Sequence, residues 1–173
     1  MSTLVPGMLV MITLLLSSAL LFSSFLSSAT SQAGSLRELA QSREAQVRSS
    51  IDITSAAVVT TYATGTDVRV LVDNVGAQSV AEFNRLDVIV QYTDPSDNLV
   101  RKYLGYSSSG MADNQWTNSA SGITPDSFNP RMWDPDEVFT IDLRVVPAIK
   151  TGTSAVVVVA TPQAASDQTT VPN

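Results

Sequence analysis

The chain opens with an apolar segment in which no side chain is ionisable before Arg37. Residues 4–29 are mainly Leu, Val, Met, Phe, Ala and Ser. These roughly 26 residues would extend about 39 Å as an α-helix. Since about 20 apolar residues cross a bilayer, the pattern predicts a hydrophobic N-terminal helix that is longer than a membrane requires.

Bulky apolar side chains occupy several faces of this predicted helix, so it is apolar all round. Ser17, Ser24 and Ser28 share one face, and small residues let neighbouring helices approach closely. A membrane anchor that tolerates serine is the alternative. We expect an interface with copies of the same helix, formed by Leu4, Val5, Leu9, Ile12, Leu15, Leu16, Ser17, Leu20, Phe22, Ser24, Phe25, Leu26 and Ser28.

A polar helical extension follows the apolar segment. Good helix formers such as Gln41 and Ala45 alternate with charged residues, which predicts a helix of about 50 residues in total. Pro6 suits a first helical turn, so the helix is expected to start near residue 3 or to bend at residues 6 and 7. Gly34 is a poor helix former, so we expect the helix to be weakest there. The predicted division is residues 1–52 as helix and linker, and residues 53–173 as an outer domain.

The pattern changes to alternating apolar and polar positions after Asp52, which is typical of half-buried strands. Two segments lack it: residues 107–135 and the polar tail from Pro162. The first is long for a loop and is expected to be variable surface or an assembly contact. The fold class is therefore α+β, a hydrophobic helix followed by an all-β immunoglobulin-like sandwich of six or seven strands. Six of these are expected over residues 56–62, 67–74, 86–92, 99–106, 137–145 and 155–160.

Composition argues against catalysis and against nucleic-acid binding. The 173 residues include no cysteine and no histidine, which removes disulfides, thiolate metal sites and every imidazole-dependent triad. From Asp52 onward seven basic and fourteen acidic residues give a net charge of −7. Such a surface repels phosphate backbones. We expect neither an enzyme nor a nucleic-acid partner.

Two acidic turns carry oxygen ligands at a spacing that suits a hard cation. One contains Asp94 and Asp97, the other Asp134 and Asp136. Neither has the glycine and the distal glutamate of an EF-hand loop, and both are also ordinary Asp-Pro turns. We expect no cofactor, with calcium at these turns as the open alternative.

The order of these parts resembles the type IV pilin superfamily in its archaeal branch, the archaellins (archaeal flagellins) and their accessory pilin-like proteins. The resemblance lies in the charge-free opening Ser-Thr-Leu-Val-Pro-Gly-Met-Leu at residues 2–9, the polar helical extension and the Val-rich strand and turn at residues 67–76. A Trp-Asp-Pro-Asp-Glu turn at residues 133–137 is similar to the Pro-Gly-Glu turn of these domains, although Asp136 replaces the glycine. Many bacterial pilins have glutamate near position five, where this chain has Val5.

The resemblance implies a subunit of an extracellular helical filament of the archaellum type, which polymerises through its N-terminal helix. It implies identical subunits as partners, and a prepilin-type peptidase and a membrane assembly platform during export. No Lys or Arg precedes the apolar run, unlike in a signal peptide, so we expect the numbering to start after a removed basic leader. Two alternatives stay open: an adhesive type IV pilus subunit, and a membrane-anchored accessory or stator protein whose β domain binds an envelope layer.

Overall fold

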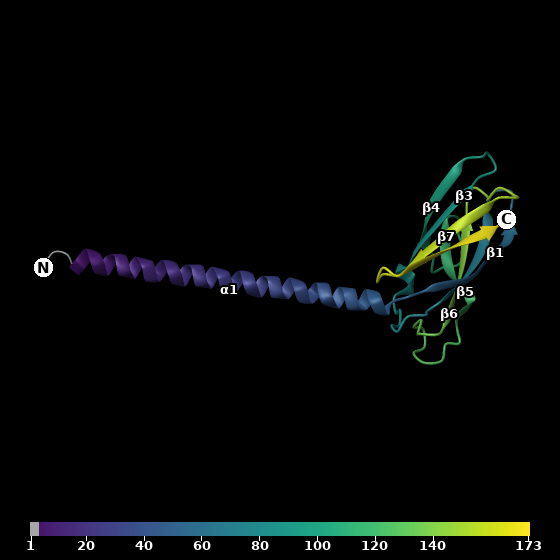
Figure 1. Ribbon diagram of the computed structural model, residues 1–173. Coiled ribbons are helices and arrows are strands. Elements are labelled where there is room, and N and C mark those ends of the chain that lie inside the picture. Colours follow the sequence, from purple (N-terminus) through teal and green to yellow (C-terminus); the bar gives the residue numbers. More distant parts are fainter. Residues whose placement is uncertain (1–3) are drawn as a thin grey trace. The chain divides into compact units, whose positions relative to one another are not determined.

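A computed structural model of the chain describes residues 4–173, and the side chains of all of these except residues 4–6, 42, 45–47, 120 and 121. The chain forms two compact units, one ending at Glu44 and one from Ala45 to Asn173. We call them the helix unit and the β domain. Figure 1 shows the order of their elements.

A single helix, α1 (Leu4–Arg48), accounts for the helix unit and the first residues of the β domain. Its 45 residues extend about 68 Å at 1.5 Å per residue. Pro6 lies in the first turn, where its missing N–H would have no intrahelical partner. Gly34 does not interrupt the helix, and its 45 residues are close to the predicted length of about 50.

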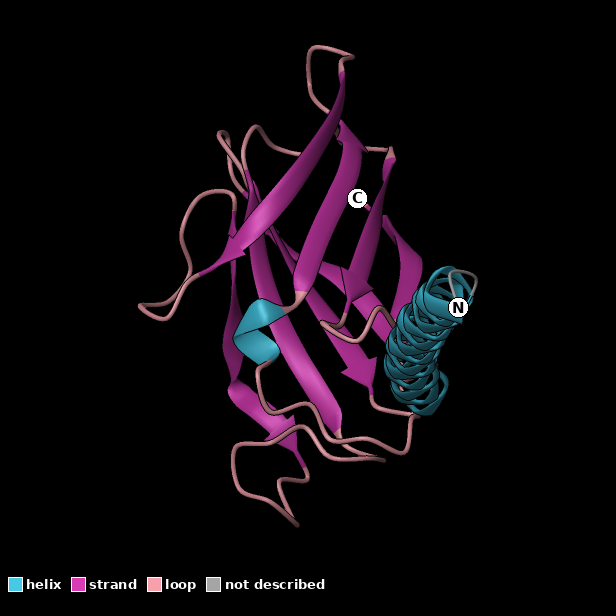
Figure 2. Ribbon diagram, turned by 90° about the vertical axis from the view of Figure 1, so that its left-hand side faces the viewer, coloured by secondary structure: helices cyan, strands magenta, loops and turns pink. Residues whose placement is uncertain are grey.

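Eight strands form one sheet in the order β1-β2-β6-β5-β4-β3-β7-β8. All neighbours are antiparallel except β4 and β5, which share two parallel residue pairs. The sheet folds over itself around a common interior (Figure 2). The strands are β1 (Asp52–Thr61), β2 (Thr66–Asp73), β3 (Asp87–Thr93), β4 (Leu99–Tyr106), β5 (Gln115–Thr124), β6 (Val138–Val145), β7 (Ser154–Ala160) and β8 (Ser166–Pro172), with a short 3-10 helix, η1 (Phe83–Arg85), before β3.

The two end strands of this sheet, β1 and β8, are held together by side chains. The Ile53 N–H donates to Asp167 Oδ2 at 2.7 Å, and Thr61 Oγ1 donates to Asn173 Oδ1 at 3.2 Å. These bonds satisfy polar groups at edges that would otherwise pair with other chains. The result is a sandwich that nearly closes into a barrel, which confirms the predicted α+β layout of an apolar helix and a β-sandwich.

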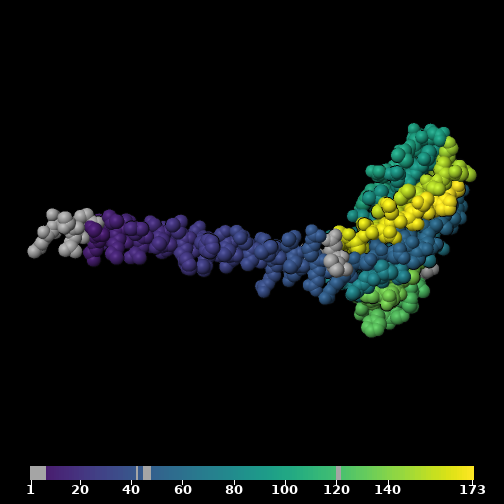
Figure 3. Space-filling view, in the orientation of Figure 1, coloured from purple at the N-terminus to yellow at the C-terminus, as the bar shows by residue number. Residues whose placement is uncertain are grey.

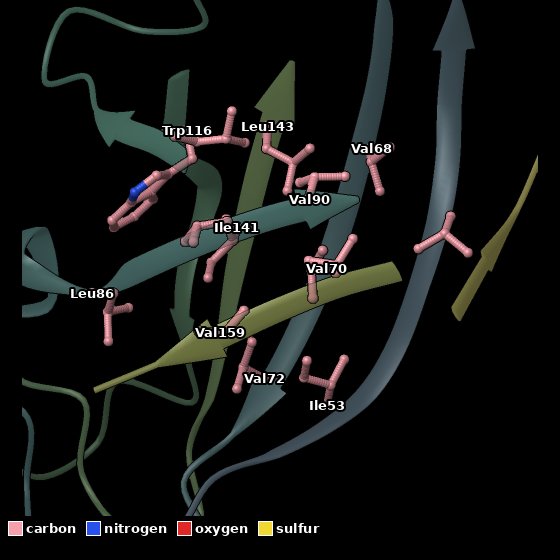
Figure 4. Close-up of a cluster of buried hydrophobic side chains, with 14 of the residues drawn as sticks. Ile53, Val68, Val70, Val72, Leu86, Val90, Trp116, Ile141, Leu143 and Val159 are labelled. Atoms are coloured by element: carbon pink, nitrogen blue, oxygen red, sulfur yellow. The ribbon is translucent and has the colours of Figure 1, made fainter. Parts of the chain in front are cut away.

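The interior is built from the alternating positions that the sequence pattern indicated. Val68, Val70 and Val72 of β2 are fully buried, and they face buried residues of the other strands. Figure 4 shows β2 and β6 side chains pointing into the same cluster as Val90 and Val159. Trp116 and Trp133 are also fully buried. They pack against Phe139, with ring centroids 6.4 and 5.6 Å away, so neither tryptophan is a surface contact.

Two segments without a predicted strand contain strands. In the expected excursion over residues 107–135, β5 pairs with β6, and its register shifts between Asn118 and Ile123. In the expected strandless tail, β8 pairs with β7 along its whole length. Both strands are rich in Ser, Thr, Asn or Gln, and each buries few apolar residues. Pairing with apolar neighbouring strands determines their conformation. It outweighs the weak preference of these polar residues for a strand.

Gly76 lies where two backbone segments approach closely, between the end of α1 and the loop after β2. A Cβ at this position would lie 2.6 Å from Ser50 N and 2.7 Å from Arg48 O. The Ala77 N–H donates to Arg48 O at 2.8 Å, and the Gly76 N–H donates to Asn74 Oδ1 at 3.1 Å. Only glycine fits this contact without a backbone shift.

We predict that Gly76→Ala destabilises the β domain by about 2 kcal/mol or more, because backbone atoms cannot yield as a side chain can. The melting temperature should fall by roughly 5 °C or more. The measurement is thermal unfolding of the full chain in detergent, followed by tryptophan fluorescence, since Trp116 and Trp133 both belong to the β domain.

Gly105→Ala is the matched control for this substitution. A Cβ at Gly105 would meet no atom within 4 Å, so the melting temperature should stay near that of the wild type. An equal melting temperature for both alanine variants would contradict the close approach at Gly76.

Candidate functional site

The helix unit presents a large apolar surface that is exposed among the described residues. From Gly7 to Gln41 the mean hydropathy of α1 reaches 2.3, and the helix is long and apolar enough to cross a membrane. Thirteen large apolar side chains between Met8 and Leu26 are 51–72% exposed. Covering them is worth on the order of 20 kcal/mol at about 1.5 kcal/mol per side chain. This surface requires lipid or other protein chains around it.

The residues predicted for the assembly interface lie on this surface. Leu9, Ile12, Leu15, Leu16, Leu20, Phe22, Phe25 and Leu26 each expose more than half of their surface, and Ser17, Ser24 and Ser28 are exposed as well. The side chains of Leu4 and Val5 lie outside the described residues. Met8, Met11, Leu14 and Leu21 are equally exposed, although the predicted interface omitted them. The exposed residues surround the helix, so they do not define a single contact stripe.

Hydroxyl groups within this surface bond to the helix itself. Ser17 Oγ donates to Thr13 O at 2.8 Å, and Ser18 Oγ donates to Leu15 O at 2.9 Å. Thr13, Thr30 and Ser35 bond to carbonyls three or four residues earlier in the same way. A hydroxyl that bonds locally needs no water. These side chains therefore allow the surface to lie in an apolar environment.

The first acidic turn uses its carboxylate oxygens internally. Asp94 Oδ1 accepts from the backbone N–H groups of Asn98 and Ser96 at 2.9 and 2.8 Å, and Oδ2 accepts from Asn98 Nδ2 at 3.1 Å. The Asn98 backbone, the Asn98 side chain and the Ser96 backbone together lower the pKa of Asp94. Asp97 pairs instead with Lys150. Asp94 therefore caps the turn that joins β3 to β4.

The second acidic turn organises the loop between β5 and β6. Asp134 is 4% exposed and accepts from Asn129 N at 2.8 Å and from Asn129 Nδ2 at 3.1 Å. Hydrogen bonds from the side chains of Ser79 and Asn129 lower the pKa of Asp134. Glu137, also buried, accepts from the N–H groups of Ser127 and Asp134 at 3.0 Å. Asp136, at a φ of 63°, supplies the turn between these two carboxylates.

Neither turn assembles the ligand set of a metal ion. Among the described residues no group of three or more His, Cys, Asp or Glu side chains is placed to hold one. The Asp94 oxygens accept from donors of their own turn, and the Asp134 oxygens accept from Asn129 of the same loop and from Ser79. The sequence spacing could not distinguish a metal loop from a self-capped turn, because both use the same oxygen-bearing residues.

Comparison with known proteins adds an independent observation. The model of one protein family, the archaeal-type flagellins, matches residues 5–171. The chain belongs to the archaeal-type flagellin family. Its members are structural filament proteins and not enzymes, so the predicted membership and the predicted lack of enzymatic activity are both confirmed. No curated protein matches the chain.

The solved structures that resemble this chain include one of an archaeal flagellum and one of an archaellum stator protein. The structure of the archaeal flagellum of Methanospirillum hungatei strain JF1 has a TM-score of 0.63 at 12% identity, covering 97% of this chain and 92% of that one. The archaellum periplasmic stator protein FlaG from Sulfolobus acidocaldarius has a TM-score of 0.48 at 15% identity, covering 70% of this chain and 98% of that one. The first similarity extends over the helix and the β domain together.

We predict that Asp134→Asn lowers the melting temperature of the β domain at pH 7, because the new amide directs a donor at the Asn129 donors. A carboxylate whose pKa is lowered on folding stabilises the fold above its unfolded pKa of about 3.9, and this contribution is lost as the pH falls towards the folded pKa. The difference from the wild type should therefore shrink below about pH 4. Thermal melts of the full chain in detergent between pH 3 and pH 7 measure it.

Asp136→Asn is the control for this carboxylate, because asparagine tolerates the positive φ of position 136. Its melting temperature should follow that of the wild type at every pH. Superimposable curves for wild type and Asp134→Asn would show that Asp134 does not stabilise the loop.

Proposed function

We propose that this chain is the structural subunit of an extracellular motility filament of the archaellum type. In this proposal α1 forms the filament core with copies of itself, and the β domain forms the outer wall. The observation that carries it is the exposed apolar surface that surrounds α1 from Gly7 to the first charged residue, Arg37. A surface that is apolar on every side fits a helix enclosed by other helices.

Several further observations support this proposal. The shared fold with the Methanospirillum hungatei flagellum covers nearly the whole of both chains. The internally bonded hydroxyls of α1 suit either a lipid or a helix-packed environment. The same helix would hold the subunit in the membrane before assembly, and helix contacts would then replace lipid contacts. A processing peptidase and a membrane assembly platform are the partners that this route requires.

Electron microscopy of material sheared from cells, with mass spectrometry of its main protein band, tests the proposal. The expected result is long thin filaments whose main protein is this chain. Scattered single copies that stay in the membrane fraction would instead support a membrane-anchored accessory or stator protein.

We predict that Ser24→Lys abolishes filaments. A lysine at the middle of an apolar helix costs about 2.5–3.5 kcal/mol in a bilayer, and its ammonium group would have no water in a helix-packed core. Negative-stain microscopy of the sheared fraction measures the loss, and tryptophan fluorescence checks that the β domain stays folded.

Two control variants separate the effect of the added charge from the effect of replacing the serine. Ser24→Ala removes the hydroxyl without adding charge, and Gln41→Lys adds the same charge at the polar end of α1. Both should form filaments. Normal filaments from Ser24→Lys would count heavily against a core of bundled helices.

A further inference from the structure

The two outer faces of the β domain differ in chemistry. On β2 and β6, Arg69 forms a bidentate pair with Asp142 and Arg144 forms one with Asp67, at 2.6–3.0 Å. These charges satisfy one another within the chain. The outer face of β4, β3, β7 and β8 carries few charges, and its central positions are apolar.

A shallow groove of about 430 Å3 runs across this second face, lined by Ile89, Gln91, Arg101, Val156, Val158 and Gln168. The register places Ile89 opposite Val158 and Gln91 opposite Val156. The three apolar side chains of the groove are only half-buried. They form an apolar floor that no segment of the same chain covers in the described structure.

A cation without an acidic partner lies at the rim of the groove. Arg101 Nε and Nη2 donate to Gln91 Oε1 at 3.1 and 2.6 Å. No carboxylate of the described residues lies within ion-pairing distance of the Arg101 guanidinium, although the β domain as a whole is acidic. The groove therefore suits a ligand that combines an apolar group with a negative charge.

The loop between β5 and β6 presents that combination. Phe128 is 85% exposed. Its neighbours are held in place, because the Ser127 N–H donates to buried Glu137 and the Asn129 N–H donates to buried Asp134. Asp126, two residues earlier, is exposed and accepts only the Arg131 N–H at 3.3 Å among the described residues. We call residues 126–129 the Phe128 loop.

The Phe128 loop and the groove lie on different parts of the domain. Figure 3 shows the green segment around residues 125–135 at one margin, away from the teal β4 and the yellow β8 that border the groove face. One chain cannot fill its own groove with its own loop, but two copies can. Such a head-to-tail contact uses two different surfaces, and contacts of this kind generate open helical arrays when the rotation between copies does not close into a ring.

We propose that the Phe128 loop of one copy docks into the β3–β4–β7–β8 groove of a second copy. The Phe128 ring lies over Ile89, Val156 and Val158, and Asp126 pairs with Arg101. This inference rests on the proposed filament function, since a polymer brings the β domains of many copies together. It adds a contact between outer domains to the contact between core helices.

Disulfide trapping tests the contact directly, because the natural chain has no cysteine. Filaments of the double variant Phe128→Cys, Val158→Cys are treated with diamide, which accepts the two electrons and two protons released by each thiol pair. A disulfide needs Cβ atoms about 3.5–4.5 Å apart. Non-reducing gels should show a ladder of covalent multimers beyond the dimer, because each copy has two different neighbours.

Control variants test whether cross-links also form at other positions or between two loops. Phe128→Cys, Thr60→Cys carries its second thiol on exposed β1 and should give no ladder, and neither single variant should cross-link. Dimers from Phe128→Cys alone would show that two loops meet each other, which overturns the proposal. Normal filaments without a ladder overturn the docking alone, whereas a wild type that forms no filaments overturns the proposed function.

A charge exchange gives a second measurement that introduces no thiol. Arg101→Glu should lower the temperature at which filaments dissociate, because two carboxylates would then face each other. Adding Asp126→Arg to the same chain should restore it. No effect of Arg101→Glu on this temperature, or no rescue by Asp126→Arg, would overturn the docking.

Discussion

The apolar surface of α1 is the constraint on which the rest of the molecule depends. The helix unit has no interior, since one helix cannot bury its own side chains. Leaving thirteen large apolar residues in water would cost on the order of 20 kcal/mol. This exceeds the whole folding stability of a typical domain. A helix with this surface is therefore unstable when uncovered in water, and lipid or other protein chains must cover it.

The β domain has the opposite character, because its large apolar residues are mostly buried and its chain carries a net negative charge. Its net charge of −7 from Asp52 onward repels other copies at long range. Asp167 and Asn173 hold β1 and β8 together, which satisfies the sheet edges with side chains of the same domain. The ion pairs of Arg69 and Arg144 satisfy the charges of one outer face. These side-chain contacts oppose the addition of a strand from another chain at the sheet edges.

Sequence patterns predicted the elements in which apolar residues recur with the period of a helix or a strand. The helix, the β2 valines and the strands β3, β4, β6 and β7 could be predicted because apolar periodicity survives in each of them. Strands β5 and β8 could not, since Ser, Asn and Gln residues form strands there only through pairing with β6 and β7. The roles of Asp94 and Asp134 depend on nearby N–H groups that spacing does not reveal. A docking role for Arg101 and Phe128 could be proposed only from the exposure of these side chains and from the strand register.

The two kinds of surface complement each other physically. Hydrophobic burial is strong but non-directional, and the exposed residues of α1 surround the helix without one preferred stripe. Its hydroxyls bond to their own helix, so they contribute little that would fix the rotation or the rise of one copy against the next. A regular helical polymer nevertheless needs a single register. In the proposed filament, the directional groups of the β domain, namely the Phe128 ring, the apolar groove and Arg101, would specify that register.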